Sequence, residues 1–231
     1  NSGSQIDRRS IPADAGPTQN DRLGASMATG DFNGDGTDDI AVGAPGVAIN
    51  GATNAGAVYV FNGTLDLAAI SIFNQGSDGF TTDPESGDRF GSSLIAGDYN
   101  NDGFDDLVIG VPNEDLGSNN QLIDAGMITV LYGSNSGLSA PSSLHQYSPG
   151  IGTHSEVGDL FGFSLASGDI NGDPYDDLVV GVPGEGVAKQ ERAGLAHVIY
   201  GSNNGLNGEG STTLNQNTRR IRTKLEARDA F

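Results

Sequence analysis

Short runs of consecutive apolar residues recur along the chain, and polar turn residues bound each of them. Ile40–Val42, Leu107–Ile109 and Leu178–Val180 are apolar at every position rather than at alternate positions. This pattern is typical of strands that are buried on both faces. A Gly-Ala-Pro or Gly-Val-Pro triplet follows each run and ends the strand, because proline cannot donate a hydrogen bond to a ladder. The pattern therefore predicts sheets that are covered on both sides.

Three further strands are expected around each apolar run. The strands that precede the runs lie within 21–30, 88–97 and 159–168. The strands that follow a polar loop lie at 56–62, 126–132 and 194–200, and weaker fourth segments lie around 70–74, 144–147 and 212–216. Four short strands in about 70 residues are the content of one propeller blade with long loops. We therefore predict an all-β fold of three four-stranded β-propeller blades.

The repeated segments also set the expected domain boundaries. Residues 1–20 read as a lead-in, and the repeats span 21–87, 88–158 and 159–227. Residues 228–231 match the openings of the second and third repeats and read as the start of a fourth. Because closed propellers typically have four to eight blades, we expect further blades in the same chain, or self-association that covers the open faces.

Composition and charge exclude several classes of partner. The 231 residues contain 36 Gly and no Cys, and carry a net charge of -19. Such a charge argues against nucleic acid and anionic membranes as partners, since phosphate binding needs a basic surface. No apolar stretch reaches the length of a membrane-spanning helix, so we predict no membrane insertion. Because the chain has no cysteine, it cannot form disulfide bonds, and any cross-link that stabilises the fold must come from another source, such as a metal ion.

An oxygen-rich loop of nine residues precedes each apolar run. The second copy begins 67 residues after the first, and the third begins 71 residues after the second. Positions 1, 3, 5 and 9 of each loop carry Asp or Asn, and position 7 is expected to offer its backbone carbonyl. Calcium takes six to eight oxygen ligands in a flexible shell, so we predict three Ca²⁺ sites. The predicted ligands are Asp31, Asn33, Asp35, Thr37 and Asp39 in the first loop, Asp98, Asn100, Asp102, Phe104 and Asp106 in the second, and Asp169, Asn171, Asp173, Tyr175 and Asp177 in the third.

Ordinary turns and EF-hands are two other interpretations of these loops, and the residues fit both of them less well. Asp, Asn and Gly are common turn residues, but three in-register copies with the same carboxylates exceed what a turn requires. An EF-hand loop has twelve residues, ends in Glu and lies between helices, whereas a strand follows each loop here. Gly36 and Gly103 suit a turn with an unusual backbone angle. Pro174 stands at the same place in the third loop, where its φ is fixed, so the third site is the least regular of the set.

Leu23-Gly24, Phe90-Gly91 and Phe161-Gly162 precede the calcium-type loops, and Gly43-Ala44-Pro45, Gly110-Val111-Pro112 and Gly181-Val182-Pro183 follow the strands. Together these motifs resemble the FG-GAP repeats of integrin alpha-subunit propellers and their bacterial relatives. The first copy has Leu in place of Phe, and two copies have Val in place of Ala. The resemblance implies a propeller of about seven blades, calcium in the hairpin between the first two strands of a blade, and a role in binding rather than catalysis.

The function favoured by the sequence is a calcium-stabilised, extracellular or cell-surface module that mediates adhesion or binds a protein or glycan. Calcium loops built from short exposed side chains suit the millimolar calcium outside cells. We expect recognition on the loops between the second and third strands, which carry Asn113, Glu114, Asp115 and Asn119 in one repeat and Glu185, Lys189 and Arg192 in the next.

A catalytic role is the main alternative, as part of a secreted polysaccharide lyase or hydrolase, and a self-associating structural component is another. We predict that the chain is not an enzyme, because it has no Cys, no nucleophile-elbow motif and three His on separate segments. His197 is expected to be a half-exposed strand residue rather than a catalytic one.

Overall fold

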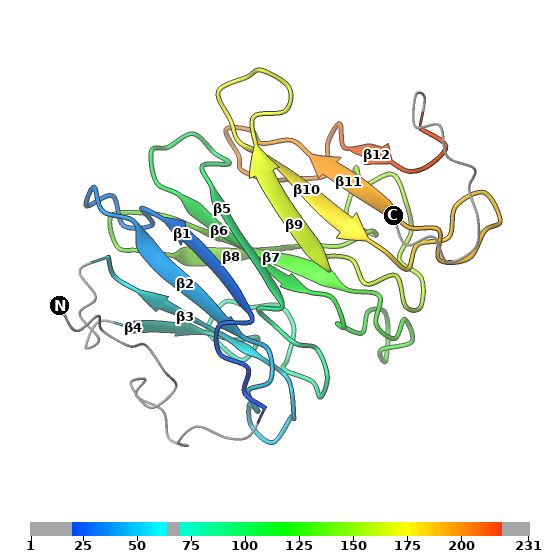
Figure 1. Ribbon diagram of the computed structural model, residues 1–231, viewed down its shortest axis with the longest axis horizontal. Coiled ribbons are helices and arrows are strands. Elements are labelled where there is room, and N and C mark those ends of the chain that lie inside the picture. Colours follow the sequence, from blue (N-terminus) through cyan, green and yellow to red (C-terminus); the bar gives the residue numbers. More distant parts are fainter. Residues whose placement is uncertain (1–19, 64–69, 219–231) are drawn as a thin grey trace.

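The computed structural model describes residues 20–63 and 70–218, which form twelve strands in three sheets (Figure 1). The predicted start of a fourth repeat at 228–231 and nearly all of the lead-in lie outside these residues. The described part of the chain holds no helix long and apolar enough to cross a membrane. The strands are β1 (Ser26–Gly30), β2 (Asp39–Ala44), β3 (Ala57–Phe61) and β4 (Ile70–Phe73), then β5 (Ser93–Gly97), β6 (Asp106–Val111), β7 (Met127–Tyr132) and β8 (Ser139–Leu144), then β9 (Ser164–Gly168), β10 (Asp177–Val182), β11 (Leu195–Ile199) and β12 (Thr212–Leu214).

Each sheet is an antiparallel meander of four strands in chain order, which confirms the predicted blades. One strand was misplaced by the sequence analysis. The fourth strand of the second repeat is Ser139–Leu144, not 144–147, because Ser148 closes a turn by donating its amide to the His145 carbonyl. Pro141 is tolerated in this strand because β8 is the edge of its sheet.

The sheets stack face to face, and their first strands β1, β5 and β9 lie side by side (Figure 1). Two apolar cores fill the spaces between them, one containing Val58, Phe90 and Ile109 and the other Val108, Phe161 and Val180. Consecutive residues of β6 thus point into different cores, and all six residues of this strand are buried. Val179 of β10 is half-buried instead, because it faces the side of the third sheet that no other sheet of the described chain covers.

The Phe-Gly and Gly-Ala/Val-Pro motifs form the joint between successive repeats. Phe90 is fully buried in the core between the first two sheets, and its amide donates to the Ala55 carbonyl of the preceding repeat. The Gly91 carbonyl accepts a hydrogen bond from the Ser26 hydroxyl at 2.6 Å. A Cβ atom on Gly43 would collide with the Gly91 carbonyl oxygen, so glycine is needed where the two backbones meet. The exact boundaries between repeats stay predictions, since both repeats take part in this joint.

A second joint links the oxygen-rich loops, and it uses the aspartate at position 8. The Asp105 carboxylate accepts a hydrogen bond from the Asp31 amide at 2.9 Å, and the Asp105 amide donates to the Asp31 carbonyl at 3.2 Å. Asp176 makes the same pair of bonds to Asp98 in the next repeat, at 3.1 Å each. Gly30 leaves room for this approach, because a Cβ there would lie 2.8 Å from Asp105 Cβ. The paired aspartates at positions 8 and 9 therefore have different roles.

Replacing Asp105 by Ala is expected to destabilise the fold by about 1–3 kcal/mol, the usual range for a lost hydrogen bond to a charged group. Asp38 occupies the same position in the first loop but is exposed, and Asp38→Ala is the matched control, expected to change the free energy of unfolding by less than about 0.5 kcal/mol. Urea unfolding of the two variants measures the difference. Equal destabilisation by both would contradict a role for Asp105 in joining the repeats.

Candidate metal centres

The three oxygen-rich loops lie in the hairpins β1–β2, β5–β6 and β9–β10, which extend from the same end of the sheets (Figure 1). The first two loops have closely similar hydrogen bonds. Asp31 at position 1 accepts the amides of positions 5 and 6, at 3.0 and 2.9 Å. Asp98 accepts the equivalent amides at 3.1 and 3.0 Å. Gly36 and Gly103 have φ values of 84° and 88°, as their sequence position led us to expect.

Positions 3 and 5 complete the turn in the same way in all three loops. The side-chain oxygen at position 3 accepts the amide of position 5, and the carboxylate at position 5 accepts the amide of position 7. These bonds are 2.8 to 3.0 Å long. Short side chains are therefore folded back on the loop, and their oxygens gather around its turn.

The aspartate at position 9 is the buried member of each set. Asp106 is fully buried, and its carboxylate accepts the Tyr99 and Gly133 amides at 3.1 and 2.9 Å. Asp177 accepts the equivalent amides of Ile170 and Gly201, both at 3.0 Å. Burial, together with the nearby carboxylates of Asp102 and Asp98, raises the pKa of Asp106 to about 7. A bound cation would oppose both effects, because it stabilises the ionised carboxylate.

The third loop departs from the other two at Pro174. Proline has no amide hydrogen, so it cannot donate to the position 1 carboxylate as Gly36 and Gly103 do. Asp169 instead accepts the amide of Gly172 at 2.6 Å. The structure thus shows a physical difference at the residue that the sequence marked as irregular.

The donor set has the chemistry that calcium requires, since every predicted ligand atom is a carboxylate, amide or carbonyl oxygen. As they are placed, the described residues hold no group of three or more acidic or histidine side chains that could bind a metal ion directly. The loop carboxylates are engaged with backbone amides instead. The carboxylates at positions 1, 5 and 9 of a loop also repel one another, so a cation would be needed to draw them together.

The opposite end of the sheets differs from the prediction. Glu114 and Glu185 were expected to be exposed recognition residues, but they are 4% and 7% exposed. Each accepts a hydrogen bond from a buried glutamine of the preceding repeat, Gln75 or Gln146. Burial, together with the nearby Asp88 carboxylate, raises the pKa of Glu114 to about 8. These two glutamates belong to the joints between repeats, and sequence analysis missed this because the contact spans 39 residues.

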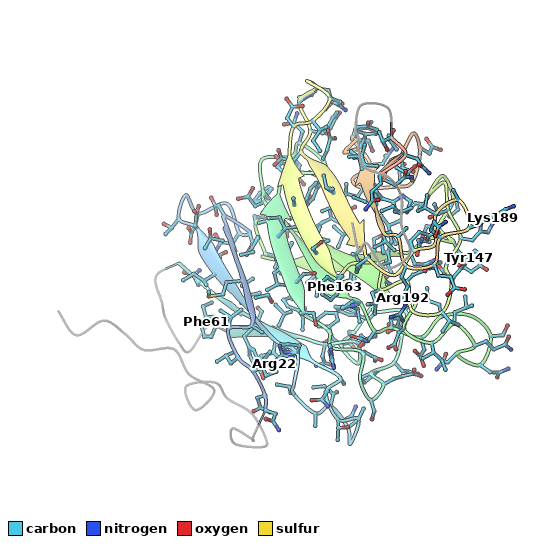
Figure 2. All side chains as sticks on the ribbon, turned by 45° about the vertical axis from the view of Figure 1, so that its right-hand side comes forward. Arg22, Phe61, Tyr147, Phe163, Lys189 and Arg192 are labelled. Atoms are coloured by element: carbon cyan, nitrogen blue, oxygen red, sulfur yellow. The ribbon has the colours of Figure 1, made fainter. Side chains whose placement is uncertain are left out.

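The remaining predicted recognition residues of these loops are divided. Asn113 and Asp115 make internal hydrogen bonds to Asp124, through its side chain and its amide. Asn119, Lys189 and Arg192 are exposed, and Figure 2 shows Lys189 extending from the surface. The exposed part of this face is therefore smaller and less acidic than the sequence suggested.

His197 is completely buried rather than half-exposed. Its Nε2 lies 2.9 Å from the Thr153 hydroxyl, and its ring packs against Phe161 at 5.7 Å between centroids. Burial lowers the pKa of His197 to about 4, so the ring is neutral at physiological pH. The position suits a core residue.

Three stacked four-stranded sheets, each with an oxygen-rich loop on the hairpin between its first two strands, define the chain as a set of β-propeller blades. A sequence model of the FG-GAP repeat family matches residues 23–61, 90–131 and 161–199. The chain therefore belongs to the FG-GAP repeat family. Each match begins at the Phe-Gly motif or its Leu-Gly equivalent and runs through the third strand.

The related proteins include an enzyme and integrin chains. Bovine phosphatidylinositol-glycan-specific phospholipase D is 34% identical over 185 residues, which cover 78% of this chain and 20% of the phospholipase. Mouse integrin alpha-8 is 33% identical over 196 residues, which cover 83% of this chain and 16% of the integrin. The chain thus spans about a fifth of the length of these curated relatives. Among solved structures, a rhamnogalacturonan lyase of Bacillus licheniformis matches 85% of this chain and 35% of its own, with 13% identity and a TM-score of 0.48.

The stability of the protein is expected to fall as the pH rises from 5 to 8. The Glu114 pKa is raised from 4.5 to about 8 by burial, so protonation favours the folded state, and this contribution is lost as the pH rises through that range. Glu114→Gln keeps the side chain neutral and should make the decline shallower by at least about 1 kcal/mol. Exposed Glu209 provides the control Glu209→Gln, which should leave the slope unchanged. The test measures the free energy of unfolding of the variants and of the unsubstituted protein across this pH range. If the Glu114→Gln variant loses stability as steeply as the unsubstituted protein, Glu114 is not responsible for the decline.

Proposed function

We propose that the chain is a calcium-stabilised, extracellular interaction module that binds a protein or glycan partner. The observation that carries this proposal is the threefold recurrence of the same loop, with carboxylates at positions 1, 5 and 9 and Asn at position 3. In the first two loops the position 1 carboxylate accepts the same pair of backbone amides. Asp31, Asn33, Asp35 and Asp39 would hold the ion in the first loop with the Thr37 carbonyl, and the equivalent residues would hold it in the others.

Calcium would act on the stability of the module and not on a chemical reaction. When bound, it supplies positive charge that neutralises the loop carboxylates. Those loops also meet one another, because position 8 of one loop is bonded to position 1 of the preceding loop. Neutralising the loops would therefore strengthen the joints between repeats as well as the hairpins themselves.

The similarity to integrin alpha chains and the exposed loops at the ends of the sheets support an extracellular location and a binding role. The FG-GAP repeats are shared with integrin alpha chains, and loops on a rigid scaffold are common sites of recognition. Kinship alone does not decide the question of catalysis, because a phospholipase is also among the relatives. His197 is buried and neutral, so it is not placed to exchange a proton with a bound substrate.

Removing calcium is expected to lower the melting temperature by many degrees, because ligands that bind the folded state alone stabilise it by mass action. The test compares melting of the protein in excess calcium and after chelation, with metal analysis to establish that the ions are gone. Isothermal titration of the metal-free protein should show three sites. A melting curve unaffected by verified removal would contradict calcium stabilisation.

The third site is expected to be weaker than the second, and one residue should account for much of the difference. Pro174→Gly restores the amide that position 6 donates in the other loops and should raise the affinity of the third site. Gly103→Pro is the reciprocal change and should weaken the second site, since it removes the bond to Asp98 and proline cannot adopt the φ of 88° at this position. Calcium titrations of both variants measure the effect. Unchanged affinities in the two variants would show that this amide does not shape the sites.

A further inference from the structure

A cavity of about 320 Å³ opens between the first sheet and the β7–β8 connection, at the end of the sheets that carries the oxygen-rich loops. Its apolar walls include Phe32, Val60, Phe73 and Leu138. Its polar groups come from Asn62, Ser71 and Ser136, and from Asn33 and Asp39, two of the predicted calcium ligands of the first loop. Pockets of this volume that combine apolar walls with polar groups are typical small-molecule sites. The cavity lies at the opposite end of the sheets from the loops that join their second and third strands.

The next repeat supplies an internal comparison, because the same space recurs there. Gly63 and Gly133 donate their amides to the position 9 aspartates of their repeats, at 2.9 Å each, which fixes the alignment of the two repeats. The residue before each glycine is Asn62 in the first repeat and Tyr132 in the second. Beyond the sheets, Gly137 and Gly205 occupy equivalent turns, and each donates its amide to the carbonyl of the serine three residues earlier at 2.7 Å.

Tyr132 fills the space that remains open in the first repeat. A Cβ atom on Gly205 would collide with the Tyr132 hydroxyl, whereas a Cβ atom on Gly137 would meet nothing within 4 Å. The Tyr132 hydroxyl oxygen accepts a hydrogen bond from the Leu206 amide at 3.1 Å. Burial raises the pKa of Tyr132, so its hydroxyl is neutral. The contact between the second and third repeats thus shows that a p-hydroxyphenyl ring fits between an apolar wall and a backbone amide.

We propose that the cavity between the first and second repeats binds a p-hydroxyphenyl ring, in the position that the Tyr132 ring occupies between the second and third repeats. The ring would lie against Phe32, Val60 and Phe73, and its hydroxyl would approach the turn that ends at Leu138. Such a ring has two sources, the tyrosine side chain of a partner polypeptide or a free small phenol. The same walls that bury the Tyr132 ring would desolvate the ring of the ligand.

The test uses the 231-residue chain in calcium buffer with two probes, N-acetyltyrosinamide and p-cresol. Titration followed by protein NMR should show saturable binding to one site, with shifts at Val60, Phe73 and Leu138. Tighter binding of N-acetyltyrosinamide identifies a polypeptide source, and binding of p-cresol alone identifies a free phenol. Methyl glucoside serves as a ring of similar size without an aromatic face, and preferential binding of this sugar would overturn the proposal.

Two substitutions exchange Asn62 and Tyr132, the residues at equivalent positions of the first two repeats. Asn62→Tyr should fill the cavity, weaken binding by at least about tenfold and raise the melting temperature. Tyr132→Asn should open a second cavity, so that two rings bind per chain. Absence of saturable binding by either phenolic probe overturns the proposal, as does binding that Asn62→Tyr leaves unchanged. Because Asn62→Tyr adds a side chain found at the equivalent position, a folded variant is expected, and its melting curve verifies this.

Discussion

The structure depends on one constraint: a sheet with two apolar faces cannot bury both of them by itself. The central strand β6 (Asp106–Val111) has no exposed residue because a sheet covers each of its faces. Burying apolar surface contributes roughly 25 cal/mol per Å², and most of that surface lies between sheets in this fold. The repeats are therefore stable through their neighbours, as in other arrays of repeated units. The joints between them decide how closely the sheets can stack.

The joints themselves consist of backbone groups in direct contact, with small or acidic side chains around them. Gly30 allows the approach at the end that carries the oxygen-rich loops, and Gly43 allows it near the opposite end. The glutamates after the Gly-Val-Pro triplets close that opposite end through buried glutamines. Few of these acids are balanced by basic residues, as the net charge of -19 indicates. Burial raises the pKa values of Glu114 and Asp105, which is the cost of holding acidic groups in such joints.

Much of this fold could be predicted from the sequence, because its strongest signals are local. The uninterrupted apolar strands, the Pro that follows them and the alternating oxygens of the loops each fall within sixteen residues. What the sequence could not reveal depends on residues from different repeats. The sequence shows Asp105 only as a further acid of the loop, whereas in the structure its carboxylate binds the Asp31 amide of the preceding repeat. Glu114 likewise reads as a surface residue, whereas in the structure it accepts a hydrogen bond from buried Gln75. The cavity likewise required the structure, since the exchange of Tyr132 for Asn62 has meaning only when both junctions are superimposed in three dimensions.

The joint at position 8 gives the array a direction. In each pair the later repeat provides the carboxylate and the earlier repeat provides the amide that it binds, so the two partners present different surfaces. Contacts of this head-to-tail kind close into rings or extend as filaments, but they do not form two-fold pairs. The position 8 joints therefore all run in the same sense along the described repeats, whereas two repeats related by a two-fold axis would bring two amides, or two carboxylates, face to face.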